Sequence, residues 1–389
     1  MRHGFNNVPN DCTGEDMNQV NATPLTHDVN TLISKNVSGP GLTPATTTYD
    51  YGDLQMGYDH TISPSIGGED TTAPPHLKVV TVNEPDGSQV VNSFGSDYGL
   101  NEGQLLKVEV KKDGVSYRTT TNTYTSDAEA AAAAFPASMG DSEVKHADAF
   151  SSSELRPLKA TTIAQDGASF SSSTNGFDAF ARATSATRSS SLGFSRTDAT
   201  GYYDDLTQWV LGQTHTQTNT NTGLVTAQTD YDTTTDLPIR TYANGVLQQT
   251  LAYAGDGTLS TVTDGLGHTT TLSNWHRGIT QSIQYADSTS KTAVVNDSGW
   301  VTAVTDENGF ATGYGYDPMG RISSIVYPNA DTTAWTPTAS AFEQVASTEY
   351  GMPAGHWRQT VTTGNATKVT YFDALWRPVV TREYDAGNV

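Results

Sequence analysis

Acidic side chains are the most numerous ionisable groups in this sequence, with 42 Asp and Glu residues against 21 Lys and Arg. Two carboxylates that face each other across a pocket can cleave a glycosidic bond by acid and base catalysis. Many of these residues, however, precede glycine or stand where an Asx turn forms, and there a carboxylate bonds its own backbone. We therefore expect a structural role for five of them, namely Asp86, Asp113, Asp166, Asp256 and Asp264.

Histidine and cysteine give little support for a metal centre. The two closest of the nine histidines, His268 and His276, lie eight residues apart. On neighbouring hairpins they could meet over a metal ion, but surface or turn positions are favoured for both. The single cysteine, Cys12, excludes an intrachain disulfide and a four-cysteine zinc site. Nucleophile elbows, zinc-protease helices and phosphate-binding loops are also absent from the sequence, so we predict no catalytic residue, no metal and no cofactor.

Aromatic residues are frequent enough to form sugar-binding surfaces, with six tryptophans and 18 tyrosines. On strands such side chains are more often cross-strand packing partners. Trp275 comes before the glycine of its hairpin and Trp300 comes after the glycine of its own, so they stand on opposite arms. This argues against a continuous aromatic stripe, although glycan binding stays open as an alternative.

The stretch from Thr312 to Pro328 shows which element positions the most distinctive of these residues. Tyr314 and Tyr316 are two residues apart and share one face of a strand. Asp317-Pro-Met-Gly320 fits a type I turn, and Arg321 begins a returning strand rich in β-branched residues. Arg321 could pair with a carboxylate or with carbonyl groups at the strand end. We interpret the set as a hairpin held by its own side chains.

Tyr-x-Tyr-Asp-x-x-Gly-Arg-Ile resembles the YD repeat of the bacterial Rhs family, and the match at Tyr314 to Ile322 is complete. A second copy, at Tyr371, Asp373 and Arg377, has Trp376 where glycine is usual. A weaker third one spans Phe177 to Arg182. The resemblance implies hairpins that curl into a hollow β-shell, which in toxin members encloses a covalently linked C-terminal cargo domain.

The C-terminal part repeats with a period of 21 residues. Gly257, Gly278, Gly299 and Gly320 are spaced by 21, and a β-branched residue follows five positions after each, namely Val262, Ile283, Val304 and Ile325. This period fits one hairpin per unit, and such units must stack to become stable. Asp264-Gly265 and Asn308-Gly309 are expected to form the second turn of their units.

The rest of the chain is less regular. Residues 1–75 show no period, and only a short strand is predicted there, near Thr46 to Tyr51. The segment could be a plug or seam packed on later repeats, or simply the loose end of a fragment. Residues 76–250 predict degenerate hairpins with turns at Asp86-Gly87, Asp113-Gly114 and Asp166-Gly167. The alternation of Val108 and Val110 with charged residues predicts one buried and one exposed face. Residues 127–134 predict a short helix inserted between hairpins and capped by Ser126. The serine-rich run 185–191 could be a linker or a strand.

Composition and charge exclude some classes of binding partner. The formal net charge of −21 repels phosphate backbones, so we expect no nucleic-acid binding. Charged residues make up only 16% of the chain, below the ~25% usual for soluble domains, and Thr, Ser, Gly and Asn are abundant. The N-terminus has no signal-peptide pattern, and no apolar run is long enough to span a membrane.

The sequence therefore predicts an all-β protein of stacked antiparallel hairpins that form part of a YD-repeat shell, with repeats over residues 251–389. Its expected role is structural and non-catalytic: the shell would enclose or display a C-terminal toxin, absent from this chain, that is used in competition between bacteria. The resemblance implies a secreted or cell-surface protein. A glycan-binding adhesion module and a polysaccharide-active enzyme are the alternatives. Residues 383–387 begin another Tyr-Asp turn without its return strand, which suggests a fragment of a longer polypeptide.

Overall fold

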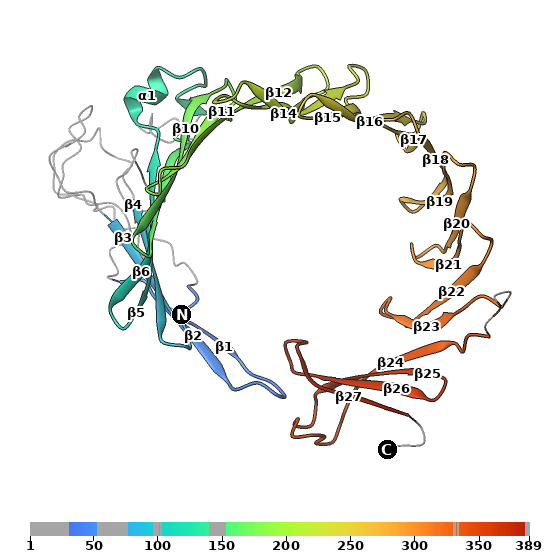
Figure 1. The fold of residues 1–389 in the computed structure, drawn as a ribbon. Coiled ribbons are helices and arrows are strands. Elements are labelled where there is room, and N and C mark those ends of the chain that lie inside the picture. Colours follow the sequence, from blue (N-terminus) through green and yellow to red (C-terminus); the bar gives the residue numbers. More distant parts are fainter. Residues whose placement is uncertain are drawn as a thin grey trace, which may run out of the picture. The chain divides into compact units, whose positions relative to one another are not determined.

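The computed structural model describes residues 31–52, 77–95, 101, 103–139, 153–329, 332 and 334–385. Within these ranges the chain consists of antiparallel strands and one helix (Figure 1). The prediction of an all-β fold of hairpins with a short helical insertion is thus confirmed. Most of the segment 1–75, and the turn predicted after Asp385, lie outside the described residues.

Contacts group the chain into two units. The first comprises Met1–Val37, Ala45–Gly201 and Gln217–Leu224, and the second comprises Ser38–Pro44, Tyr202–Thr216 and Val225–Val389. The boundaries predicted near residues 75 and 250 rest on sequence pattern and stay predictions.

The first unit is a series of paired strands. Its strands are β1 Ser34–Val37, β2 Ala45–Asp50, β3 Leu77–Asn83, β4 Ser88–Gly95, β5 Leu105–Lys112, β6 Val115–Tyr124, β9 Leu158–Gln165, β10 Ala168–Phe177, β11 Ala183–Ser190 and the start of β12 Ser195–Asp205. Each strand pairs with the next one named here. The serine-rich run 185–191 is therefore mainly strand, because its residues up to Ser190 belong to β11.

Turn residues explain where these strands reverse. Asp113 and Gly114 have φ of 52° and 77°, and Asp166 and Gly167 have φ of 50° and 75°. Two successive left-handed residues form the two-residue turn whose twist matches that of a hairpin. The predicted turns at both places are confirmed.

The insertion between β6 and β9 contains helix α1, Asp127–Ala131, and the two-stranded pair β7 Ser138–Met139 and β8 Ser153–Glu154. Ser126 caps the helix, and Glu129 completes a capping box. The prediction of a helix reaching residue 134 was wrong. The amides of Ala132 and Ala133 bond the carbonyls three residues back, so the helix tightens and ends after Ala131.

The second unit continues the same construction. Its strands from β14 on are β14 Leu224–Tyr231, β15 Pro238–Ala243, β16 Val246–Tyr253, β17 Leu259–Asp264, β18 Thr269–His276, β19 Ile279–Gln284, β20 Ser290–Val295, β21 Val301–Thr305, β22 Ala311–Tyr316, β23 Ile322–Val326, β24 Thr338–Gln344, β25 Trp357–Thr363, β26 Ala366–Phe372 and β27 Pro378–Asp385. Each pairs antiparallel with the next. Strand β13, Val210–Asn219, precedes them.

The 21-residue spacing is present in the strand register. The β-branched residues of the sequence pattern face partners that are also 21 apart: Leu251 faces Val262, Leu272 faces Ile283, Ala293 faces Val304 and Tyr314 faces Ile325. The pairing of neighbouring strands therefore repeats every 21 residues.

A second series of turns shares this spacing. The turns begin at Asp264, Tyr285 and Asp306, and each closes when an amide bonds the carbonyl three residues back. The left-handed residue is Gly267, Ser288 and Gly309 in turn. The prediction for Asp264-Gly265 placed the turn correctly but named the wrong glycine, because Gly267 holds the left-handed position.

The described strands form a single layer with little core. Extensive contacts link paired neighbours. The prediction that β5 has one buried face was wrong, since all its residues are half-buried. In the second unit a small buried cluster exists at Met352, Val369 and Tyr371, with Val380 and Tyr384 packed against it.

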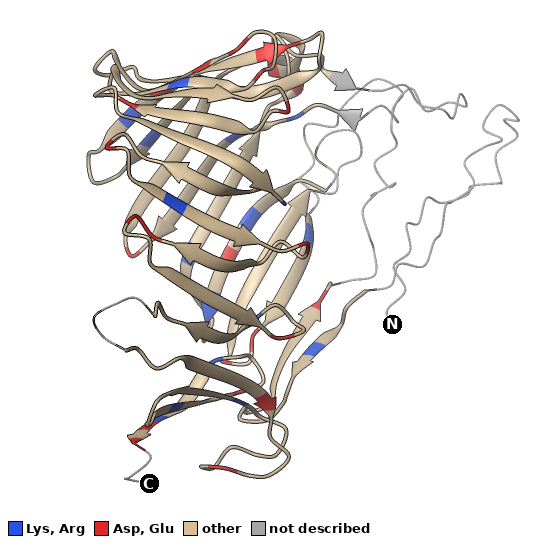
Figure 2. Cartoon of the chain, turned by 90° about the vertical axis from the view of Figure 1, so that its right-hand side faces the viewer, with Lys and Arg blue, Asp and Glu red and all other residues tan. Residues whose placement is uncertain are grey.

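Charged side chains are sparse along the strands, and most of the ribbon in Figure 2 is neither acidic nor basic. Acidic colour is concentrated at connections between strands. In the part of the chain that the structure describes, no helix is long and apolar enough to cross a membrane.

Candidate functional site

The hairpin at Asp317 is closed by its own side chains. The Asp317 Oδ1 atom accepts hydrogen bonds from the backbone amides of Met319, at 2.9 Å, and Arg321, at 3.0 Å. Its Oδ2 atom accepts from Arg321 Nε at 2.6 Å. The amide of Gly320 bonds the Asp317 carbonyl at 2.9 Å. We call this arrangement, an aspartate that holds both the turn backbone and an arginine four residues on, the Asp–Arg turn.

The same turn recurs at the two imperfect copies of the signature. At Asp373, Oδ1 accepts from the amides of Leu375 and Arg377 and Oδ2 accepts from Arg377 Nε at 2.7 Å. At Asp178, the corresponding donors are the amides of Phe180 and Arg182 and, at 2.7 Å, Arg182 Nε. The copy at Phe177 to Arg182, weak as sequence, thus has the full geometry.

The position before the arginine explains why the signature tolerates change. It is left-handed in all three turns, with φ of 80° at Gly320, 62° at Trp376 and 58° at Ala181. Glycine adopts this conformation without strain, whereas tryptophan and alanine do so at a cost of about 1–2 kcal/mol. The aspartate hydrogen bonds, which all three turns share, offset that cost.

Decayed repeats keep parts of the arrangement. Asn296 Oδ1 accepts from the amides of Ser298 and Trp300, which reproduces the backbone bonds without the ion pair. Asp264 bonds the amides of Leu266 and His268, and His268 Nδ1 lies 2.9 Å from Asp264 Oδ2 in the place of the arginine. The sequence analysis placed Asp178 and Arg182 in a weak third copy, and an Asp followed four residues later by Arg is the feature that this copy shares with the other two.

The turn carboxyls are held in the charged form. Hydrogen bonding from the Arg321 amide is the main cause that lowers the pKa of Asp317. Burial would raise the pKa of Asp178 and Asp373, but hydrogen bonds from Arg182 and Arg377 lower it overall. A carboxylate whose oxygens are occupied in this way is poorly placed to transfer protons. The geometry suits turn closure.

The tyrosines of the signature also have structural contacts. The Tyr316 hydroxyl donates to the Val301 carbonyl at 2.7 Å, and its ring lies 5.2 Å from that of Trp300. Tyr371 is buried among His356 and Tyr350. Tyr314 is half-buried on β22, where it faces Ile325.

An aromatic group connects the Asp317 and Asp373 turns. The Arg321 guanidinium lies 4.5 Å above the Phe342 ring, which stacks on Trp376 at 5.0 Å. Trp357 lies 5.3 Å from Trp376 on the same group. The signature residues of the two copies are therefore linked through Phe342.

Other candidate residues are engaged separately. Trp275 Nε1 donates to the Leu259 carbonyl, and His276 Nε2 lies 3.4 Å from Asp297. Among the five turn aspartates of the sequence pattern, Asp86, Asp256 and Asp264 bond turn amides as expected. No group of three or more potential metal ligands occurs within the described residues.

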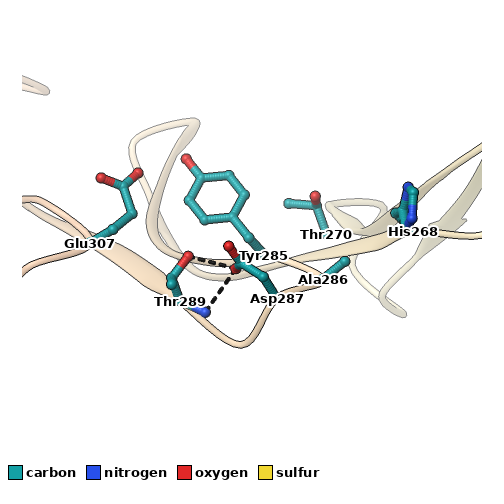
Figure 3. Close-up of a pocket in the computed structure, with 7 residues that line it drawn as sticks. All are labelled: His268, Thr270, Tyr285, Ala286, Asp287, Thr289 and Glu307. Atoms are coloured by element: carbon teal, nitrogen blue, oxygen red, sulfur yellow. Dashed lines mark hydrogen bonds between the residues drawn. The ribbon is translucent and has the colours of Figure 1, made fainter.

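An open hollow of about 620 Å³ lies beside the second series of turns in the second unit. Figure 3 shows its lining residues, which are His268, Thr270, Tyr285, Ala286, Asp287, Thr289 and Glu307. Asp287 accepts from the Thr289 amide and hydroxyl, so this carboxylate also serves a turn. The hollow does not bring two free carboxylates to one enclosed point.

Comparisons with known proteins found one matching family model and several solved structures with low similarity to this chain. No curated protein matches the chain. Among solved structures, the Photorhabdus luminescens Tc holotoxin pore has 11% identity and a TM-score of 0.44, and 87% of this chain and 18% of that one are covered. The TcdB2-TccC3-Cdc42 complex has 11% identity and a TM-score of 0.42, with 88% and 18% covered. The chain thus spans less than a fifth of the length of these two proteins.

The family model described as RHS Repeat matches residues 295–332, which contain the complete signature and the Asp317 turn. Residues 295–332 therefore match an RHS repeat.

Proposed function

We propose that this chain is a non-catalytic wall element that encloses or displays a covalently linked C-terminal cargo domain. The observation that carries the proposal is the reuse of one Asp–Arg turn at Asp178, Asp317 and Asp373. A catalytic site is built once, whereas an architectural device is repeated along the chain.

The surface chemistry of the strands supports this role. Threonine hydroxyls bond one another across neighbouring strands, as in Thr187 with Thr197 at 2.7 Å and Thr338 with Thr363 at 2.7 Å. Such pairs stabilise a sheet with side chains that water also accepts. A wall of this kind can lie beside an unfolded polypeptide without holding it by a large apolar surface.

By this proposal the cargo is a toxin used between bacteria, and the protein is secreted or carried on the cell surface. Both points rest on the resemblance to the Rhs family. The absence of catalysis is part of the same proposal and rests on the occupied turn carboxylates.

Limited proteolysis tests the wall function. A protease-sensitive reporter domain is joined after Val389, and its cleavage rate is compared with that of the same domain mixed with the separate chain. We expect several-fold slower cleavage in the joined protein. Equal rates in the two samples would contradict enclosure.

Glycan binding is a second candidate, favoured by the exposure of Trp335, a residue that is 57% exposed. The Trp335 ring lies 6.2 Å from that of Tyr327, whereas Trp300 packs on Tyr316 and close to Gly320. Glycan-array binding that disappears with Trp335→Ala but persists with Trp300→Phe would support this candidate. An array without signal for the unmodified chain would remove it.

A further inference from the structure

A loop near the start of the described chain lies against the last Asp–Arg turn. Residues 38–44 join β1 to β2, and they belong with residues 225–389 to the second unit. The amide of Ala374, the residue after Asp373, donates to the Pro40 carbonyl at 3.0 Å. This bond joins residues more than 300 positions apart in sequence.

Glycines make the close fit of this loop possible. A Cβ atom on Gly39 would stand 2.4 Å from the Ala374 Cβ atom, and one on Gly41 would stand 2.4 Å from the end of Met352 and 3.2 Å from the Asp373 Cβ atom. On the opposite surface, a Cβ atom on Gly355 would stand 3.2 Å from the Pro40 ring. Larger residues at these positions would force the surfaces apart.

Burial distinguishes the covered turn from its two equivalents. The Asp373 side chain is 2% exposed, whereas that of Asp317 is 21% exposed and that of Asp178 is 20% exposed. The three carboxylates make the same bonds, so the internal geometry of the turn does not account for the difference. What differs at Asp373 is the neighbouring loop 38–44, whose Gly41 lies so near that an added Cβ atom would stand 3.2 Å from the Asp373 Cβ atom.

We propose that residues 38–44 form a strap that seats on the surface made by Met352, Gly355, Asp373 and Ala374 and locks the last Asp–Arg turn. The strap has a seated state and a released state, and release exposes the Asp373 carboxylate. Trp376 belongs to the same turn and stacks on Phe342 and Trp357, so its fluorescence reports the position of the turn. The strap thereby couples an early loop to the final hairpin.

A size-swap experiment tests this contact. Gly39→Ala adds one methyl group at the tightest point, and Gly39→Ala with Ala374→Gly removes one from the facing residue. Gly255→Ala is the matched control, because a Cβ atom there meets nothing within 4 Å. The measurements are amide hydrogen exchange at Trp376 and Arg377, corrected for intrinsic rates, and Trp fluorescence.

We expect Gly39→Ala to speed exchange at both amides by about tenfold or more, since overpacking favours the released state. The control should exchange like the unmodified chain, and the double variant should recover most of the protection. Unchanged exchange in Gly39→Ala, or no recovery in the double variant, would overturn the proposal.

If Gly39→Ala does not fold, Gly41→Ala replaces it, with Gly87→Ala as its control. Both glycines are left-handed, with φ of 75° and 81°, but only Gly41 has neighbours in its way. Backbone strain is therefore matched, and faster exchange in Gly41→Ala alone is the supporting result. Equal exchange at Trp376 and Arg377 in the two variants would overturn the strap.

Discussion

Asp178, Asp317 and Asp373 show how one residue type can close a hairpin whatever stands beside it. Each carboxylate accepts two backbone amides and one guanidinium, and these bonds persist when the left-handed glycine becomes alanine or tryptophan. Asn296 shows that the backbone bonds can persist without the ion pair. For closing the hairpin, the hydrogen bonds from the turn amides are therefore more important than the ion pair with the arginine.

The two contributions can be separated at Asp178. Asp178→Ala removes both the hydrogen bonds from the turn amides and the ion pair with Arg182. We expect a loss of about 1–3 kcal/mol in the free energy of unfolding, as for hydrogen bonds to charged groups. Asp178→Asn keeps the acceptor for Phe180 and Arg182 and loses the ion pair, so we expect less than about 1 kcal/mol. Urea titration measures both. An Asn variant as unstable as the Ala variant would show that the ion pair dominates.

Acid should weaken these turns in a defined pH range. The folded-state pKa of each of the three aspartates lies below its ordinary value. A lowered pKa stabilises the folded state fully above the unfolded pKa of about 3.9, and this contribution is lost as pH falls through the folded pKa. We expect the thermal unfolding midpoint to decrease as the pH is lowered below about 4. In Asp178→Asn the midpoint should decrease less steeply with pH. An identical slope in that variant would exclude Asp178 as a contributor.

At the scale of elements, the sequence predicted most hairpins because turn chemistry is local. The residue pairs Asp113-Gly114 and Asp166-Gly167 each suffice to predict a turn. Ser126 and Glu129 likewise suffice to predict the start of the helix. The burial of β5 was mispredicted because alternation in sequence does not reveal whether a second layer covers the strand. The strap could not be predicted, because a contact between residues 40 and 374 has no local pattern.

Neighbouring repeats contact each other at the turn that contains Gly320. A substitution at Gly320 tests how strongly this contact couples them. A Cβ atom there would lie 3.1 to 3.3 Å from the indole of Trp300, whereas one on Gly257 meets nothing within 4 Å. Both glycines are left-handed, with φ of 80° and 84°. We expect Gly257→Ala to cost about 1–2 kcal/mol and Gly320→Ala to cost about 1–3 kcal/mol more. Chemical denaturation measures the difference, and equal costs would show that Trp300 moves aside freely.

The whole molecule differs from an ordinary globular domain in where its stability resides. Stability in a single layer of paired strands comes mainly from cross-strand pairs and from turns, because little apolar surface is removed from water. The fully buried hydrophobic cluster at Met352, Val369 and Tyr371 is a local exception. The strap lies on this same region, so substitutions of buried residues in the last hairpins should destabilise the protein most.

Two valines in the second unit measure how uneven the stability is. Val369 on β26 is 4% exposed, and Val294 on β20 is 56% exposed. Val369→Ala removes buried methyl groups and should cost about 1–3 kcal/mol, while Val294→Ala should change the free energy of unfolding by less than about 0.5 kcal/mol. Hydrogen exchange should localise the Val369→Ala effect to β25, β26 and β27, because a repeat contacts chiefly its neighbours. Equal losses for the two valines would contradict this uneven distribution, because they would mean that Val294 is also covered in solution.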